Sequence, residues 1–140
     1  MSTTLSPPND STDPGIPPDI EAAEEAPRVL VVDDERDVRT LVCHILVDQG
    51  YEVDSAVDGR EALEKIRAGA PDLVVLDLMM PEVDGWHVLR ELKGAAGAPR
   101  VVVLSAFGDA GRVAEAGAVG FLAKPFRFAQ LIDACRKALD

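Results

Sequence analysis

Four short apolar runs in this chain each end at polar residues that can carry chemistry. The runs cover residues 29–32, 73–76, 101–104 and 119–123, and the residues that follow them are Asp33-Asp34, Asp77, Ser105 and Lys124-Pro125. Runs rich in β-branched residues without polar alternation are typical of strands that are buried on both faces of a parallel sheet. The carboxyl ends of such strands share one edge of the sheet, where open α/β sheets bind ligands. We therefore predict that three carboxylates, a hydroxyl and an amine meet at one site.

The segments between these runs predict helices. A first helix, ending near Gly50, is indicated by apolar residues at helical spacing, namely Val38, Leu41, Val42, Ile45 and Leu46. Further helices are expected over residues 60–68, 85–93, 109–116 and 128–139, of which the third has room for only a short helix. Residues 51–57 alternate between apolar and more polar side chains, which favours an edge strand.

This alternation of strands and helices predicts an α/β fold with right-handed crossovers. We expect a flavodoxin-like, doubly wound, five-stranded parallel sheet with helices on both faces. The edge character of the second strand favours the strand order 2-1-3-4-5, in which strands one and three are neighbours at the switch point. In that order Asp33, Asp34 and Asp77 come together.

The first 27 residues differ in composition from the rest of the chain. They contain six of the ten prolines and six acidic residues, but no Lys or Arg. Such a segment cannot bury enough apolar surface to offset the entropy of ordering, so residues 1–27 are predicted to form a disordered, acidic, Pro-rich tail. Residues 28–140 are expected to form a single domain.

Charge and hydropathy limit the partners and the location. The net charge of −11 disfavours direct binding to nucleic acid or to an anionic membrane, because Lys and Arg supply most of that affinity. No apolar run approaches the roughly 18 residues that a spanning helix needs, and the first residues lack the basic start of a signal peptide, so we expect a cytoplasmic protein. Cys43 and Cys135 show no metal-ligand spacing and are predicted to be buried free thiols.

The predicted site suits a divalent cation and a phosphoryl group. Neighbouring carboxylates repel one another unless a cation is bound or a pKa rises, and oxygen ligands without His or Cys suit Mg²⁺. The alternative is that Asp33 or Asp34 only caps the first helix. Asp77 ends the most hydrophobic run and is the candidate nucleophile, with Lys124 and Ser105 neutralising the phosphoryl oxygens. Taken singly, Lys124 could be a surface ion pair and Ser105 a strand-end cap.

The polar segments, taken together and in order, resemble the motifs of the receiver domain of two-component response regulators. The resemblance covers residues 28–140 and rests on Val31-Val32-Asp33-Asp34-Glu35, on residues 77–85 from Asp77-Leu78-Met79-Met80-Pro81 to Asp84-Gly85, on Ser105-Ala106 and on Lys124-Pro125-Phe126. It implies that Asp77 is the phosphoacceptor. It also implies that Asp34 binds Mg²⁺ directly, that Asp33 helps partly through water, and that the backbone carbonyl of Met79 completes the metal shell.

The same resemblance implies a switch and its partners. Ser105 would be the switch hydroxyl, Phe121 the aromatic residue that changes rotamer on activation, and Lys124 the contact to the phosphoryl group, followed by a cis bond to Pro125. A sensor histidine kinase or phosphotransfer protein would supply the phosphoryl group, and an unidentified output protein would receive the signal. The chain would be a phosphorylation-dependent switch rather than an enzyme, with only Mg²⁺-dependent self-phosphorylation and slow self-dephosphorylation. Slow hydrolysis is expected because Met79 and Phe107, which the resemblance places beside the phosphoryl group, are bulky and apolar.

One departure and two alternatives remain open. Lys124 follows Ser105 by 19 positions, fewer than is usual in receiver domains, so the fourth helix is expected to be truncated or irregular. A haloacid dehalogenase-like phosphatase would also use an aspartyl phosphate, but it would need a carboxylate at the position of Met79. A receiver-like interaction module that no longer uses phosphate is the other alternative, although every expected reactive side chain is present.

Overall fold

The computed structural model describes residues 25–80, 85–106 and 110–140. Strands and helices alternate within these residues, and their bounds lie within one or two residues of those predicted from the sequence. The elements are β1 (Arg28–Val32), α2 (Arg36–Asp48), β2 (Glu52–Ala56), α3 (Gly59–Gly69), β3 (Leu73–Asp77), α4 (Gly85–Leu92), β4 (Arg100–Ser105), α5 (Ala110–Glu115), β5 (Gly120–Ala123) and α6 (Phe128–Leu139).

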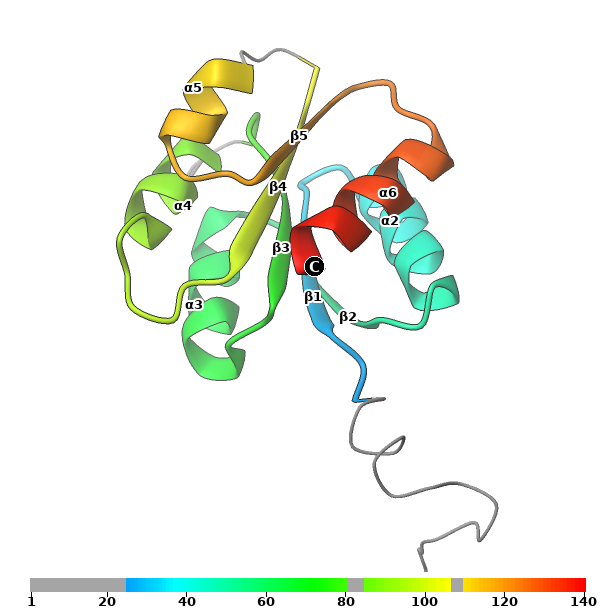
Figure 1. Cartoon of the computed structure of the whole chain (residues 1–140), viewed down its shortest axis with the longest axis horizontal. Coiled ribbons are helices and arrows are strands. Elements are labelled where there is room, and N and C mark those ends of the chain that lie inside the picture. Colours follow the sequence, from blue (N-terminus) through cyan, green and yellow to red (C-terminus); the bar gives the residue numbers. More distant parts are fainter. Residues whose placement is uncertain (1–24, 81–84, 107–109) are drawn as a thin grey trace, which may run out of the picture.

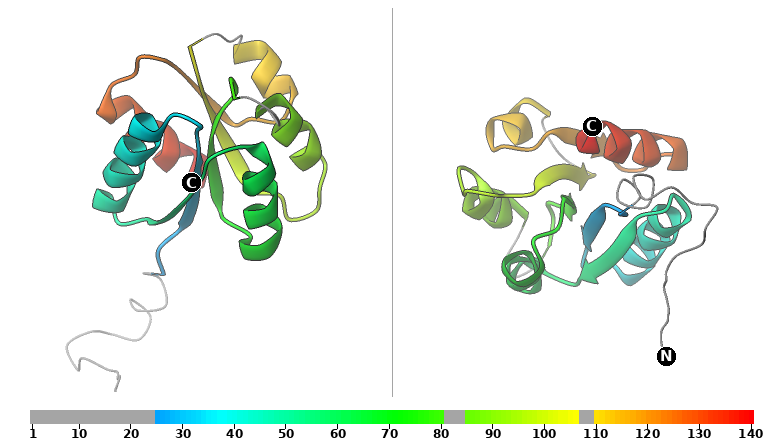
Figure 2. Two further views of the ribbon diagram at one scale, coloured as in Figure 1. Left: turned by 180° about the vertical axis from the view of Figure 1, so that it is seen from behind. Right: turned by 60° about the horizontal axis from the view of Figure 1, so that its bottom comes forward.

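The strands form one parallel sheet in the order β2-β1-β3-β4-β5, as predicted. Helices α2 and α6 cover one face of the sheet, and α3, α4 and α5 cover the other (Figure 1). The same layers are seen from behind and from below in Figure 2. Strand β2 is an edge strand with an alternating pattern of burial, which confirms the interpretation of residues 51–57.

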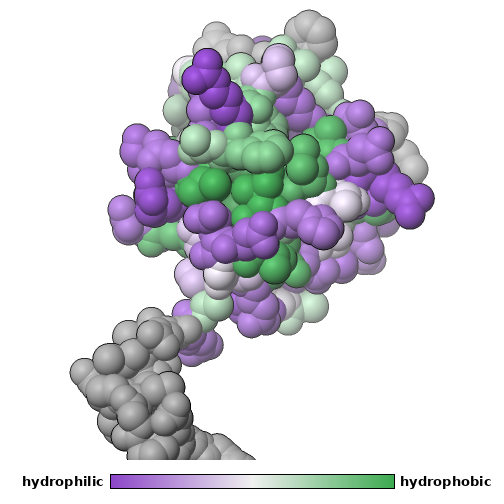
Figure 3. Space-filling view, turned by 90° about the vertical axis from the view of Figure 1, so that its right-hand side faces the viewer, coloured by the Kyte–Doolittle hydropathy of each residue, from purple (hydrophilic) through white to green (hydrophobic). Residues whose placement is uncertain are grey.

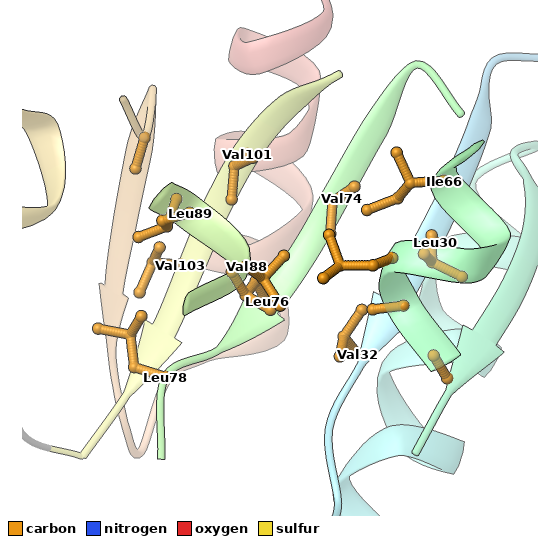
Figure 4. Packing of buried hydrophobic residues seen from close by; sticks show 14 of the residues in the cluster. Leu30, Val32, Ile66, Val74, Leu76, Leu78, Val88, Leu89, Val101 and Val103 are labelled. Carbon is orange, nitrogen blue, oxygen red and sulfur yellow. The ribbon is translucent and has the colours of Figure 1, made fainter. Parts of the chain in front are cut away.

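The core consists of two apolar layers, one on each face of the sheet. Alternate residues of a strand point to opposite faces, so that Leu30 and Val32 join the layer under α3 and α4, whereas Val29 and Val31 join the layer under α2 and α6. Figure 4 shows the first of these layers, where side chains of β1, β3 and β4 pack against α3 and α4. Because β3 is completely buried, its end holds Asp77 in a fixed position.

The two helices that cover the second layer, α2 and α6, keep some apolar residues exposed. Leu41 and Val47 of α2 and Phe128 of α6 are about half exposed, although Leu41 and Phe128 belong to the apolar patterns that predicted these helices. Figure 3 shows hydrophobic side chains gathered in the middle of this side of the molecule, with hydrophilic ones around them. Both cysteines are free thiols. Cys135 is buried, as predicted, but Cys43 is only partly buried, since it lies on α2 between the buried Val42 and the exposed His44.

The predicted tail lies almost entirely outside the described residues. Of residues 1–27, the structure describes only Glu25, Ala26 and Pro27, and the Pro27 carbonyl accepts a hydrogen bond from the Glu52 amide at 3.0 Å. Among the described residues, no helix is both long and apolar enough to cross a membrane.

Candidate phosphoryl and metal site

The strand ends bring the predicted polar residues to one edge of the sheet. Asp77 and Ser105 are the last residues of β3 and β4, while Asp33 and Lys124 directly follow β1 and β5. The register aligns these ends, since Asp77 lies opposite Leu104 and Ser105 opposite Ala123. The order of the strands therefore converts four separate segments of sequence into one site.

Three carboxylates form the acidic part of this site. One oxygen atom each from Asp33, Asp34 and Asp77 lies within 4.8 Å of the other two. Asp33 and Asp77 are buried, with exposed fractions of 1% and 4%, whereas Asp34 faces the solvent. An all-oxygen donor set that is open on one side fits Mg²⁺, which binds through one or two carboxylates and keeps several waters.

Lys124 lies within ion-pair distance of two of these three carboxylates. Its Nζ lies 3.2 Å from Asp33 Oδ2 and 3.6 Å from Asp77 Oδ2, and its side chain is only 20% exposed. Burial acts to lower the pKa of Lys124, but attraction to the Asp33 and Asp77 carboxylates outweighs it and raises the pKa above the ordinary value. The ammonium group therefore stays charged, and the ion pairs are part of the site rather than of the surface.

The carboxyl group of Asp77 has an unusual acidity. The pKa of Asp77 is raised from 3.8 to about 6, and burial is the largest of the causes. The amide of Met79, which donates to Asp77 Oδ1 at 3.1 Å, acts in the opposite direction, as does Lys124. The Asp33 and Asp34 carboxylates reinforce the increase. Asp77 is thus a carboxylate whose negative charge is incompletely compensated by the protein alone.

Backbone and side-chain hydrogen bonds hold Asp33 in place. Its Oδ1 accepts from the Glu35 amide at 2.9 Å, its carbonyl accepts from Arg39 Nη1 at 2.8 Å, and its amide donates to the Ala56 carbonyl at 3.2 Å. The N-cap residue of α2 is Glu35, so neither Asp33 nor Asp34 occupies the capping position. This disfavours the alternative in which these aspartates only cap the helix.

The remaining predicted residues lie at different distances from the carboxylates. The Met79 amide donates to Asp77 Oδ1, while the residue as a whole is 58% exposed. Ser105 is buried, and its carbonyl accepts a hydrogen bond from the Lys124 amide at 2.9 Å. Phe121 is partly buried within β5, opposite Val103, and packs against the core. The bond from Lys124 to Pro125 is cis, as expected. Phe107 lies outside the described residues.

Two residues that support the site were not assigned a role from the sequence. Arg39 fixes the Asp33 carbonyl, as described above. Gly85 starts α4 against the end of β3: a Cβ atom there would collide with the Asp77 carbonyl oxygen and would lie 2.6 Å from Leu78 Cα. The Gly85 amide also donates to the Leu78 carbonyl at 3.2 Å. The glycine in the segment after Asp77 was the available signal, but the sequence did not reveal what it contacts.

Comparison with known proteins identifies the family. Residues 29–136 match the family model of the response regulator receiver domain, so the chain belongs to this family, as its motifs predicted. The chemotaxis protein CheY of Bacillus subtilis is 39% identical over 119 residues, which cover 82% of this chain and 99% of CheY. The response regulator MprA of Mycolicibacterium vanbaalenii is 44% identical over 115 residues, which cover 80% of this chain but only 50% of MprA. The chain thus spans nearly all of one relative and half of the other.

Solved structures have the same fold. CheY4 of Vibrio cholerae is 32% identical with a TM-score of 0.75, covering 81% of this chain and 99% of that structure. The receiver domain of NtrX from Brucella abortus is 40% identical with a TM-score of 0.74, covering 79% of this chain and 97% of that structure. Receiver domains are signalling switches that histidine kinases phosphorylate and that regulate output proteins.

Proposed function

We propose that this protein is a phosphorylation-dependent switch that accepts a phosphoryl group on Asp77. The observation that carries the proposal is the position of this buried carboxylate, which shares a sheet edge with two further carboxylates and lies 3.6 Å from the Lys124 ammonium. A nucleophile, a cation and an acidic metal site at the end of one buried strand are the components that phosphoryl transfer needs.

In the forward step, a carboxylate oxygen of Asp77 attacks the phosphorus atom of the donor. An oxygen–phosphorus bond forms, while the bond from phosphorus to the donor atom breaks and its electron pair leaves with the donor. Lys124, already held beside Asp77, stabilises the negative phosphoryl oxygens, and the Ser105 hydroxyl donates a hydrogen bond to one of them. Hydrolysis reverses the modification, since attack of water on phosphorus releases phosphate and restores the carboxylate.

Asp33, Asp34 and Asp77 would hold Mg²⁺, together with the backbone carbonyl of Met79. When bound there, the ion supplies positive charge that compensates the carboxylates and the transferred phosphoryl group. The fit of this site to Mg²⁺ rests on the oxygen-only donor set and on the spacing of the carboxylate oxygens within 4.8 Å. The raised pKa of Asp77 is consistent with a site that lacks one positive charge in the protein alone.

The partners follow from the chemistry of the site. A sensor histidine kinase or a phosphotransfer protein would be the donor, in the cytoplasm, and an output protein would recognise the phosphorylated form. Ser105 and Phe121 would form the switch, because both lie on the strands nearest Lys124. We further propose that residues 28–140 form the receiver domain and that residues 1–27 form a disordered tail.

Phosphorylation by a small donor tests this function. The wild-type protein, Asp77→Asn and the control Asp48→Asn would be incubated with acetyl phosphate and Mg²⁺ and then examined by intact-mass spectrometry. Asp48 is an exposed aspartate at the end of α2. We expect one phosphoryl group on the wild type and the control and none on Asp77→Asn. Equal incorporation in all three would exclude Asp77, and no incorporation in any would favour an interaction module that does not use phosphate.

A further inference from the structure

Strand β2 lies at one edge of the sheet and pairs with β1 on its inner side. The Glu52 amide and the Ala56 carbonyl form hydrogen bonds with the residues that flank β1. Because the backbone groups of successive residues point alternately to the two sides of a strand, those of Val53 and Ser55 point away from the sheet. An outer edge of this kind is a template on which another strand can add.

Two charged residues cover the outward backbone groups of Ser55. Asp54 Oδ1 accepts a hydrogen bond from the Ser55 amide at 2.8 Å, and Lys65 Nζ, which belongs to α3, donates to the Ser55 carbonyl at 2.6 Å. The same ammonium lies 3.2 Å from Asp54 Oδ1, so the two covering groups are themselves paired. Both backbone groups of Ser55 are thus bonded within the chain rather than free for a partner strand.

A third charged residue extends this cover along the edge. Glu61 Oε1 accepts a hydrogen bond from the Val57 amide, one residue beyond the end of β2, at 2.7 Å. Its Oε2 lies 3.8 Å from Lys65 Nζ. The side chains of Asp54, Glu61 and Lys65 are 69%, 38% and 35% exposed. Ion pairs at the surface contribute little to stability, whereas charges on an edge strand deter the addition of a second strand.

The backbone beneath this cover is complementary to itself. With a twofold axis at Ser55, two antiparallel β2 strands would set Ser55 opposite its copy, where the two residues exchange both backbone hydrogen bonds. The same register would set Val53 of one copy opposite Val57 of the other, and Val57 is 47% exposed. Pairs of β-branched residues stabilise antiparallel strands. An uncovered β2 would therefore fit a second β2 strand.

We propose that Asp54, Glu61 and Lys65 close this edge, so that β2 does not pair with β2 of a second copy of the chain. Pairing at Ser55 requires that Asp54 release the amide and that Lys65 release the carbonyl in both copies. The displaced charges would then lie beside the partner strand without the hydrogen bonds that they form in the closed edge. The cover therefore opposes self-association.

The variant Asp54→Ala/Lys65→Met, called the open variant, uncovers both backbone groups of Ser55 and leaves the net charge unchanged. The control, Arg67→Met/Glu91→Ala, removes an exposed ion pair of 3.7 Å between α3 and α4 by matching changes of side chain. Sedimentation velocity of the unphosphorylated proteins gives the dimer dissociation constant, and thermal denaturation followed by circular dichroism shows that each variant is folded.

The expected effect follows from the hydrogen bonds that the open variant can form. Pairing of Ser55 with its copy makes two backbone hydrogen bonds, and each corresponds to a factor of about two to ten in an equilibrium constant. The dimer dissociation constant of the open variant should therefore lie about 4- to 100-fold below that of the wild type. The control should keep the wild-type value, and so should Lys65→Arg, which retains a cation at this position.

Two further changes, each added to the open variant, show whether association runs through β2. Val53→Pro removes an outward amide but no hydrogen bond to β1, and proline is tolerated on edge strands. Val57→Lys places a charge on the edge at an exposed position, where it should not disturb the fold. Either change should return the dissociation constant to the wild-type value.

Two results would overturn the closed edge. An open variant that associates no more strongly than the wild type would mean that these bonds only tie α3 to β2, in which case the variant should lose thermal stability alone. Association of the open variant that persists with both Val53→Pro and Val57→Lys would mean that another surface holds the copies together.

Discussion

Lys124 Nζ lies 3.6 Å from Asp77 Oδ2, which joins the residue after β5 to the last residue of β3 across the intervening strand β4. The same nitrogen lies 3.2 Å from Asp33 Oδ2, so one ammonium serves two buried carboxylates. In the absence of a metal ion, this cation offsets part of the repulsion that the acidic group would otherwise create.

We predict that Lys124→Gln is less stable than the wild type and slower to accept a phosphoryl group. Removing one partner leaves buried carboxylates without compensation, at a cost of about 1–3 kcal/mol in the metal-free protein. The exposed Lys137, which pairs with Asp133 on α6, provides the control Lys137→Gln. Urea denaturation and the rate of acetyl phosphate labelling measure the two effects. Equal behaviour of the two variants would show that Lys124 has no special role.

The raised pKa of Asp77 predicts a stability that depends on pH. The pKa is 3.8 for the ordinary group and about 6 in the folded protein, so the folded state favours the protonated carboxyl group. The stability that this preference contributes is fully present below pH 3.8 and is lost as the pH rises through 6. Asp77→Asn, which has no proton to lose, should therefore gain stability relative to the wild type between pH 4 and pH 7.5, by at most about 3 kcal/mol. Urea denaturation in the presence of a chelator measures this.

A carboxylate with the opposite shift serves as the control for that measurement. Hydrogen bonds from Lys137 and Arg136 hold the pKa of Asp133 below its ordinary value. Replacing Asp133 with Asn should therefore not stabilise the protein at pH 7.5. A relative stability of Asp77→Asn that stays constant from pH 4 to pH 7.5 would contradict the assigned acidity of Asp77.

Much of the site could be predicted from where the apolar runs end. Asp33, Asp77, Ser105 and Lys124 follow or end strands that the residue pattern identifies, and the rules of parallel α/β topology place those ends together. The edge character of β2 was also visible, because its alternating pattern differs from the continuous runs of the central strands. These features are properties of single segments, and they therefore do not depend on knowing the tertiary contacts.

The contacts between segments could not be predicted in the same way. The sequence identified Gly85 as part of a motif, but its approach to the Asp77 carbonyl depends on the path of the chain between β3 and α4. The cation–π contact of Arg112 with Trp86 depends on how two helices pack. Likewise, the apolar spacing of α2 predicts a buried face but does not show which residues at the border of that face stay in contact with solvent. The exposure of Leu41 could therefore not be predicted. Such contacts arise from packing rather than from local preference.

Gly85→Ala should disturb both the fold and the site. The new methyl group would collide with the Asp77 carbonyl oxygen, and the required displacement of α4 should cost about 1–3 kcal/mol. Gly69→Ala is the control, since a methyl group there would meet only the end of the flexible Arg28 side chain, at 3.0 Å. Thermal denaturation and acetyl phosphate labelling should show a loss for Gly85→Ala alone. A Gly85→Ala protein with wild-type stability and labelling would show that this close approach is unimportant.

We expect the three carboxylates and the Ser105 hydroxyl to differ in their effect on metal binding. Asp34 is exposed, so Asp34→Ala removes one of the three oxygen ligands without disturbing the core, and Mg²⁺ affinity should fall more than about tenfold. Ser105→Ala should leave the affinity unchanged, because we expect its hydroxyl to contact the phosphoryl group rather than the ion. Titration of the single tryptophan, Trp86, measures binding by fluorescence.

Asp37→Ala is the control for the loss of charge in this experiment, since Asp37 is an exposed carboxylate in the first turn of α2. Asp37→Ala should weaken Mg²⁺ binding only through the loss of a long-range attraction between its charge and the ion. Salt at about 0.15 M largely screens such an attraction beyond roughly 8 Å. A helix-capping role for Asp34 would give a different pattern: Asp34→Ala would lose stability in urea yet bind Mg²⁺ with the affinity of Asp37→Ala. That result would remove Asp34 from the metal site, and the remaining carboxylates, Asp33 and Asp77, would have to hold the ion between them.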